Sequence, residues 1–424
     1  MLNQLKKSKS ITYFFFLLIF SFFIDLSIAK DKKFTFYLTK NPTNLDYWWL
    51  EKNNYGQSIN KINFQTSIKF KNSNTTYAIN LLSKDKNNIV NDIYLNETFI
   101  KYNFDQNTFL RVGRYYKDFS TYLNDNLSSG SMLISYNAQA MPKLGLVSSK
   151  KYSKASKIHF DFGIAHGIFQ KNNLYTKPPY LHEKFIYLNV VNNNNQFSIG
   201  LVHEAMWGGS TSRLGDQPDS FKDFLKVFIS ADGDLMEGEP HANAVGNHLG
   251  IWDFFYQRVT NNQILKLYYQ HLFEDTSGLR FANKTDGLWG LELINYIPQT
   301  TLLVEYISTK NQTINPPYVQ EGYYNHGIYD LGWTYKNYTL GSPFIQNTDS
   351  SNIVDTEVVY IAANTIFSSK YHSNIKISKK TNTGEKLNYK FQLTRVWDSK
   401  YDVSFLVINN DNNIGFGVTL NRYL

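Results

Sequence analysis

The stretch from Glu321 to Phe344, EGYYNHGIYDLGWTYKNYTLGSPF, combines tyrosine and tryptophan rings with glycines, amides and one histidine. Tyrosine and tryptophan have apolar faces and polar tips, so their rings can stack on a sugar ring and hydrogen-bond its hydroxyl groups. The alternative interpretation is that these rings pack the segment against the rest of the protein. The densest set of candidate polysaccharide-binding residues comprises Tyr323, Tyr324, Asn325, His326, Trp333 and Tyr335.

Trp207 is a second candidate for stacking on a sugar. It follows His203 and Glu204 and precedes the flexible pair Gly208–Gly209. The alternative interpretation is a strand that ends at an interfacial tryptophan and a glycine turn. We favour the alternative, because aromatic residues are routine at the ends of membrane-spanning strands. Trp207 nevertheless stays in the candidate set.

The loop from Asp232 to His248 is rich in groups that bind metals, and such oxygen-rich loops can hold calcium. The spacing, however, lacks the regular alternation and the terminal bidentate glutamate of a calcium loop, and histidine is a poor calcium ligand. We therefore predict no metal site, and a solvated or plug-forming loop instead. The residues concerned are Asp232, Asp234, Glu237, Glu239, His241 and His248.

Catalysis needs a nucleophile or an activated water beside a positioned base. The chain offers nine histidines and many serines, but none forms a recognisable nucleophile motif. Cysteine is absent, which excludes disulfide bonds, thiolate metal sites and cysteine nucleophiles. We therefore expect no enzymatic activity and no cofactor.

The N-terminus has the order of regions found in a secretory signal peptide. Lys6, Lys7 and Lys9 precede an apolar run from Ile11 to Ile24, and small residues follow up to Ala29. An uncleaved anchor is the alternative, but the run is shorter than the roughly 20 residues that a spanning helix needs. We predict a cleaved signal at residues 1–29 and a single domain over residues 30–424.

The remaining chain has no other long apolar run, yet 16% of all residues are aromatic. Strands that cross a membrane would reconcile these two facts, because their signal per segment is weak. The net charge of +8 is spread along the chain without a dense basic cluster, so nucleic acid is not an expected partner.

The dominant pattern in the chain has a period of two residues. In KLNYKFQLTRVW, for example, apolar residues at 387, 389, 391 and 393 alternate with polar ones. Side chains alternate across a strand, so such segments predict strands with one apolar and one polar face. Predicted strands cover residues 34–39, 62–70, 76–83, 93–104, 108–115, 157–165, 182–191, 196–204, 248–258, 263–273, 287–296, 300–308, 354–365, 370–379, 386–397, 400–408 and 413–420.

Short turns rich in asparagine link most of these segments, which favours an all-β, up-and-down antiparallel sheet. A soluble sandwich or propeller competes with a transmembrane β-barrel. The barrel is favoured by charged and amide residues on the polar faces, by a chain that ends on a strand, and by aromatic residues near strand ends, as at Tyr115–Tyr116, Tyr268–Tyr269 and Trp397–Tyr401.

The length of the chain suggests about 18 strands, with 16 to 20 acceptable. Three tracts break the alternation, at residues 117–143, 205–247 and 309–353. Loops of this length are usually functional. We predict that they are long extracellular loops and that at least one of them folds into or over the barrel.

Three blocks of sequence resemble the Wzi-type capsule assembly proteins of the bacterial outer membrane. They are GLVHEAMWGG at residues 200–209, GNHLGIWDF at 246–254 and YYNHGIYDLGWTYKNYTLGSPF at 323–344. The resemblance implies a barrel of about 18 strands with an outer mouth closed by loops. It also implies a lectin-like role, in which the barrel holds capsular or O-antigen-type polysaccharide at the cell surface. Better-known members add a periplasmic helical bundle, but this sequence has no convincing helical tract.

Three functions therefore stay open: polysaccharide attachment, a porin or substrate-selective channel, and an outer-membrane hydrolase. The expected location is the bacterial outer membrane. The expected partners are surface polysaccharide, outer-membrane lipid with lipopolysaccharide, and the barrel assembly machinery. We expect a monomer.

Overall fold

A computed structural model describes residues 31–40, 62–83, 93–153, 156–233, 244–274, 276–312, 322–345, 353–410 and 413–423. The predicted signal peptide falls outside these ranges. So does most of the acidic loop, including Asp234, Glu237, Glu239 and His241.

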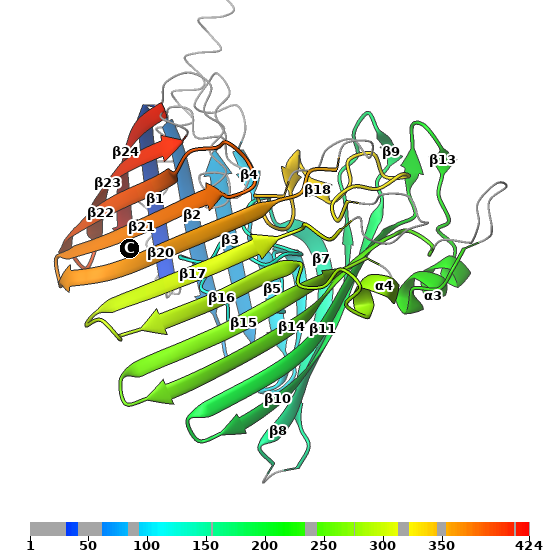
Figure 1. Cartoon of the computed structure of the whole chain (residues 1–424), viewed down its shortest axis with the longest axis horizontal. Helices are drawn as coiled ribbons and strands as arrows, with labels where there is room; N and C mark the ends of the chain where they lie inside the picture. The colour runs from blue at the N-terminus through cyan, green and yellow to red at the C-terminus, as the bar shows by residue number, and fades with distance from the viewer. Residues whose placement is uncertain are drawn as a thin grey trace, which may run out of the picture.

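The described chain is dominated by antiparallel strands, and two short helices interrupt them (Figure 1). The wall strands are β1 (Asp31–Lys40), β2 (Ile62–Lys71), β3 (Thr75–Ser83), β4 (Ile93–Leu95), β5 (Phe99–Asn103), β6 (Thr108–Tyr115), β7 (Met141–Lys151), β8 (Ile158–Ile168), β10 (Tyr180–Asn192), β11 (Asn195–Trp207), β14 (Asn247–Thr260), β15 (Gln263–Phe273), β16 (Gly287–Ile294), β17 (Thr300–Ser308), β20 (Glu357–Ser368), β21 (Tyr371–Lys380), β22 (Asn388–Asp398), β23 (Tyr401–Asn410) and β24 (Asn413–Tyr423). The loops add β9 (Tyr175–Lys177), β12 (Ser210–Thr211), β13 (Gly215–Asp216), β18 (Thr334–Tyr335), β19 (Tyr338–Thr339), α3 (Phe221–Ile229) and α4 (Thr276–Leu279).

The wall strands form one sheet of 19 named strands. Because β4 and β5 both pair with β3, they share one place in the wall, which leaves 19 − 1 = 18 strand positions. Strand β1 pairs with β2 on one side and with β24 on the other, so the ladder returns to its start. This pairing removes both sheet edges and confirms the predicted all-β, up-and-down barrel.

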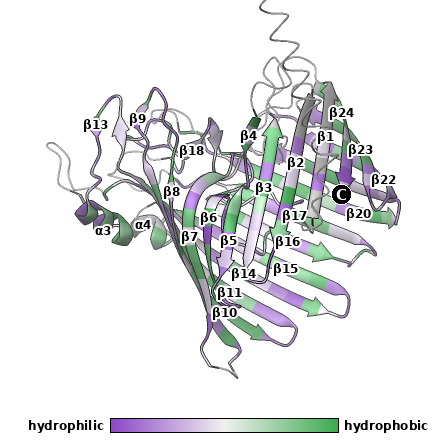
Figure 2. Cartoon of the chain, turned by 180° about the vertical axis from the view of Figure 1, so that it is seen from behind, coloured by the Kyte–Doolittle hydropathy of each residue, from purple (hydrophilic) through white to green (hydrophobic). Residues whose placement is uncertain are grey.

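The two faces of the wall differ in polarity, as the period of two predicts. Leu267, Phe391 and Phe416 point outward and are 43%, 40% and 59% exposed, whereas Gln270 and Glu305 point inward and are fully buried. Hydrophobic and hydrophilic bands alternate along the strands in Figure 2. An apolar exterior over a polar interior is the arrangement of a membrane barrel.

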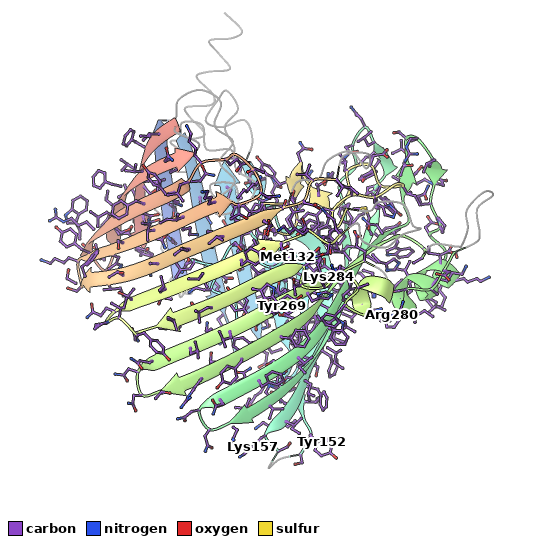
Figure 3. All side chains as sticks on the ribbon, viewed as in Figure 1. Met132, Tyr152, Lys157, Tyr269, Arg280 and Lys284 are labelled. Atoms are coloured by element: carbon purple, nitrogen blue, oxygen red, sulfur yellow. The ribbon has the colours of Figure 1, made fainter. Side chains whose placement is uncertain are left out.

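The two ends of the barrel are unequal. Tyr152 and Lys157 mark the end with short turns, and Met132 lies toward the opposite end (Figure 3). At the turn end, connections run from two residues, between β10 and β11, to six, between β7 and β8. The opposite end, called the loop end below, carries the long connections and both helices. Neither of these helices, nor any other helix of the described ranges, is long and apolar enough to cross a membrane.

The connection between β6 and β7 enters the barrel and is called the plug (residues 116–140). Its apolar side chains are buried, with Phe119, Leu127, Met132 and Leu133 at most 1% exposed. Its polar groups bond to inward-facing acceptors on four consecutive strands, β14 to β17: Ser120 Oγ to Asp253 (2.5 Å), Met132 N to Gln270 (2.9 Å), Asn124 Nδ2 to Glu292 (2.5 Å) and Ser128 Oγ to Glu305 (2.6 Å). These contacts confirm that one long loop folds into the barrel.

Room for the plug depends on a glycine in the wall. Gly290 faces inward on β16, opposite Tyr268 on β15. A Cβ at Gly290 would overlap the ring of Tyr268, so only glycine lets this ring lie close to the wall. From there the hydroxyl of Tyr268 reaches Glu305.

Three details of the sequence prediction are wrong. Strand β7 was absent from the predicted set, although it pairs with β6 and β8 along its length. Helix α3 lies within a tract predicted to be an irregular loop. Tyr115, Tyr116 and Tyr268 are not interfacial, because each is at most 5% exposed and buried inside the barrel.

Candidate functional site

The segment with the highest density of rings forms a compact cover at the loop end, called the cap (residues 322–345). Its centre is the hairpin β18–β19, which turns at Lys336 and Asn337 with φ of 54° and 71°. Two consecutive positive φ angles make a tight hairpin turn, in which asparagine is well tolerated. The hairpin folds back on Tyr324, whose carbonyl accepts a bond from the Trp333 amide (2.9 Å).

The cap is fastened to the plug by hydrogen bonds that span about 200 residues of sequence. The indole of Trp333 donates to the Leu133 carbonyl (2.9 Å), and the Ser135 hydroxyl donates to the Gly341 carbonyl (2.6 Å). A Cβ at Gly341 would overlap the carbonyl oxygen of Met132, so glycine permits this close approach. The cap and the plug therefore form one interlocked body.

A buried carboxyl group ties the cap to the wall. Asp286, just before β16, accepts hydrogen bonds from the Tyr323 hydroxyl (2.9 Å) and from the amide N–H of Asn311 (2.8 Å). Burial raises the pKa of Asp286, and these hydrogen bonds oppose the rise. Tyr323 also accepts a bond from Asn283 (2.7 Å), which satisfies both functions of its hydroxyl group.

The cap also contacts two neighbouring loops, residues 169–179 and 208–219, called the rim loops. They are joined by the small sheet β9–β12–β13. Tyr329 donates to the Gly208 carbonyl (3.1 Å), and Tyr175 accepts a bond from Leu331 N (3.1 Å). On the outer surface, Arg213 forms an ion pair with Asp330 (3.0 Å). The cap is thus held from below by the plug and from the side by the rim loops.

Six of the seven candidate ligand residues meet in the cap, but they differ in exposure. The rings of Tyr323, Tyr324, Trp333 and Tyr335 are at most 4% exposed, and their polar tips bond to protein groups. Asn325 and His326 are only partly buried. The rings therefore build the cap, and these two side chains are the members of the set that reach its surface.

His326 combines partial exposure with a constrained ring. Its Nδ1 accepts weak bonds from the amides of Ile328 (3.2 Å) and Tyr329 (3.3 Å). Burial, with a smaller effect from nearby His248, lowers the pKa of His326 to about 4. The imidazole is therefore neutral at physiological pH and can exchange hydrogen bonds with an uncharged ligand through its other nitrogen.

Trp207 stands apart from the other six. It faces outward at the loop end of β11, where Tyr180 and Phe224 cover it with ring centroids at 5.3 and 5.5 Å. His203 and His248 lie nearby and share a hydrogen bond of 2.8 Å. Among the residues that the structure describes, no group of three or more histidines or carboxylates could hold a metal ion.

Sequence reasoning missed the contribution of the rim loops. Exposed basic and amide groups surround the cap there, but the loops carry few aromatic residues to draw attention. Their sequence signal is turn chemistry, at Gly208–Gly209 and at the left-handed Gly215 between Arg213 and Asp216. Several exposed groups of the cap and rim loops can form hydrogen bonds with sugar hydroxyl or carboxylate groups. They are Lys171, Lys177, Arg213, Lys336 and Asn337.

Comparison with a solved structure supports the fold. The chain resembles Wzi, described as a carbohydrate-binding β-barrel outer-membrane protein involved in group 1 capsule assembly in Escherichia coli. The TM-score is 0.61 and the identity 15%, over 93% of this chain and 84% of that one. Weaker matches include a loop-deletion mutant of OmpT from Vibrio cholerae (TM-score 0.39, 8% identity, 93% and 99% coverage) and a mutant porin of Rh. blastica (0.42, 10%, 93% and 99%).

Comparison with curated proteins gives no match. A family model, in contrast, covers most of the chain. It matches residues 50–404, a range that contains the plug, the cap and both rim loops, and its description is capsule assembly protein Wzi. With its barrel fold and loop-closed mouth, this chain belongs to the Wzi family of outer-membrane capsule assembly proteins.

Proposed function

We propose that this protein binds exported polysaccharide on the outer surface of the cap and rim loops and thereby attaches it to the cell, without catalysing a reaction. The single observation that carries this proposal is the interlocked plug and cap. They bury the inward face of β14 to β17 and leave the surface of the loop end for a ligand. Family membership supplies the class of ligand.

The ligand in this proposal meets the edge of the cap. Asn325 and His326 supply hydrogen bonds, and Lys336 and Asn337 are exposed at the hairpin turn of the same segment. The buried rings of Tyr324 and Trp333 hold this edge in place. Trp207 takes no part in the proposed surface, because it faces outward and is covered by α3.

The setting of the protein is part of the same proposal. Residues 1–29 act as a cleaved signal, residues 30–424 form one barrel domain inserted by the barrel assembly machinery, and the barrel is a monomer surrounded by outer-membrane lipid and lipopolysaccharide. The loop end faces outward, because bacterial barrels carry short turns on the periplasmic side and long loops outside.

Asn325→Ala and His326→Ala test the ligand surface. Each removes a proposed partner of the sugar and leaves the four buried rings of the candidate set in place, so affinity should fall by about 1 kcal/mol, roughly fivefold. The measurement is binding of purified capsular polysaccharide to the detergent-solubilised barrel, together with the cell-bound fraction of polysaccharide in the host. Asn194→Ala, an exposed amide at the turn end, is the matched control and should bind normally.

Trp333→Ala tests the buried rings that hold the cap in place, as distinct from the residues proposed to contact the ligand. Loss of this fully buried ring should cost about 3–5 kcal/mol and disturb the cap itself. Normal retention by the Asn325 and His326 variants would refute the proposed surface. Steady ion conduction by the unmodified barrel in a planar bilayer would favour the porin alternative instead.

A further inference from the structure

Helix α3 is built by a local sequence signal. Ser220 caps its first turn by accepting a bond from the Asp223 amide (3.2 Å), and the Asp223 carboxylate accepts from the Ser220 amide (3.0 Å). This reciprocal pair is a capping box. Ser230, with φ of 55°, ends the helix. The helix is therefore defined at both ends rather than being a chance turn in a long loop.

The inner side of α3 packs on the outside of the barrel wall. Val227 is fully buried, and the rings of Phe224 and Phe228 contact His182 on β10 with centroids at 5.6 and 5.3 Å. Two polar contacts add to this packing. Lys184 on β10 donates to the carbonyl of Phe228, and Ser230 Oγ lies 3.1 Å from Nε2 of His203 on β11. The helix is fixed against the wall at the loop end, as Figure 1 shows.

A second apolar side of α3 is exposed and packs on no strand of the part of the chain that the structure describes. Phe221, Leu225 and Ile229 are 75%, 49% and 71% exposed. Because they are spaced four residues apart, they form one row along the helix, next to the row that packs on the wall. Lys222 and Lys226 follow on the remaining side of the helix. One helix thus has a wall-facing side, an exposed apolar side and a basic side.

The exposed apolar row continues the lipid-facing surface of the barrel. Along β10, the outward residues run from His182 and Lys184, covered by α3, to Ile186 and Leu188, which are 51% and 38% exposed. The apolar surface of the wall therefore begins directly beside the helix. The end of the apolar, lipid-facing surface of a barrel marks the boundary between acyl chains and headgroups, which is where amphipathic helices bind.

We propose that α3 is a membrane-anchoring helix that inserts Phe221, Leu225 and Ile229 into the outer leaflet and directs Lys222 and Lys226 to the anionic phosphates of the lipid headgroups. The exposed row of α3 continues the apolar outer surface of the barrel wall, which identifies lipid as the partner of this row. The basic side supplies the charge complementarity that such a leaflet requires. This inference depends on the barrel being in a membrane, not on its binding a polysaccharide.

The absence of cysteine allows a direct test, because a single introduced cysteine is a unique labelling site. The full-length protein is reconstituted into bilayers of phosphatidylethanolamine and phosphatidylglycerol, with a nitroxide at Leu225→Cys, Lys222→Cys or Leu188→Cys. Power saturation then compares the access of oxygen, which partitions into lipid, with that of a water-soluble nickel chelate. Leu188 is the lipid-facing reference and Lys222 is the matched neighbour on the same helix.

The Leu225 label should resemble the Leu188 label, with high oxygen access and at least a fivefold lower access to nickel than the Lys222 label. Equal nickel access at Leu225 and Lys222 would overturn the proposal, because the helix would then stand in water. Low access to both reagents at Leu225 would also overturn it, because a protein surface would then cover the row.

Discussion

Replacement of Glu305 by alanine should release the plug. The carboxyl group of Glu305 is fully buried on β17 and accepts three hydrogen bonds: from Ser128 Oγ (2.6 Å), from Ser129 N (2.7 Å) and from the hydroxyl of Tyr268. Ser128 and Ser129 belong to the plug, whereas Tyr268 belongs to the wall. Only the two plug donors therefore distinguish a docked plug from a released one.

The size of the effect follows from these two bonds. A buried donor left without an acceptor costs about 1–3 kcal/mol. Two such donors weaken docking by about 2–6 kcal/mol, which raises the released fraction by roughly 30-fold to 10⁴-fold. Glu305→Gln keeps one oxygen for Ser128 but offers an amide to Ser129 N, so it should lose about half of this energy.

Single-channel recording in planar bilayers measures the released fraction. The unmodified barrel should be silent, Glu305→Ala should show repeated openings, and Glu305→Gln should open less often. Gln392→Ala is the matched control, since Gln392 is a polar residue of β22 that bonds to Ser404 on the neighbouring strand (3.1 Å). Its removal should leave the barrel closed.

One result would refute this reasoning. If Glu305→Ala assembles into a heat-modifiable barrel but conducts no more than the unmodified protein, these two bonds do not hold the plug. Openings of equal frequency in Gln392→Ala would show that any loss of wall polarity opens the barrel, and the specific role of Glu305 would fail.

Three further predictions concern the wall and the cap. Phe391→Lys should destabilise the barrel by about 2–4 kcal/mol in urea titrations, because this ring faces lipid. Gln392→Lys, at the adjacent inward position, should change stability by less than about 1 kcal/mol, and equal effects of the two changes would mean that the assigned faces are wrong. Gly341→Ala should lower the stability of the protein by about 1–3 kcal/mol and speed proteolysis within the cap, because the new methyl group would overlap the carbonyl oxygen of Met132. Unchanged proteolysis would exclude that close approach. Burial holds the pKa of His326 at about 4, below the ordinary 6.5, so its contribution to cap stability is complete above pH 6.5 and is lost as the pH falls toward 4. The protection factors of residues 322–345, which correct the exchange rate for the intrinsic pH dependence of amide exchange, should therefore fall over this window, and less so in His326→Gln. An identical pH response of the protection factors in the two proteins would contradict the assignment.

The wall could be predicted from sequence because each strand carries its own evidence. Lipid on one side and a polar interior on the other impose alternation residue by residue, as at Phe391 and Gln392. The sequence pattern does not predict strand β7, because Pro142 near its start and the polar run from Ser148 to Lys151 interrupt that alternation. Its place is fixed by pairing with β6 and β8, which no local pattern records.

The site could be predicted only in part. A dense group of rings marks the cap, but composition does not reveal whether a ring faces a sugar or another segment of the protein. Trp333 is buried because it donates to Leu133, a residue 200 positions away. Helix α3 was missed for a different reason. Its capping box at Ser220 and Asp223 is visible in the sequence, but nine residues are too few to show a clear helical period.

The position of the plug acceptors has a consequence for the order in which the protein is made. The plug follows the sixth named strand, yet Ser120 donates to Asp253, which is 133 residues further along the chain, and the carbonyl of Leu127 accepts a bond from Tyr360, 233 residues further. A barrel without its second half would offer neither of these partners, so its plug would keep only its contacts to the first half, such as the bond from the Ser120 amide to the hydroxyl of Tyr187 on β10 (3.1 Å). Docking of the plug therefore reports that the later strands have been inserted. Full docking of the plug consequently requires strands from both halves of the barrel, and a barrel that lacks its later strands cannot present a finished cap to the outside.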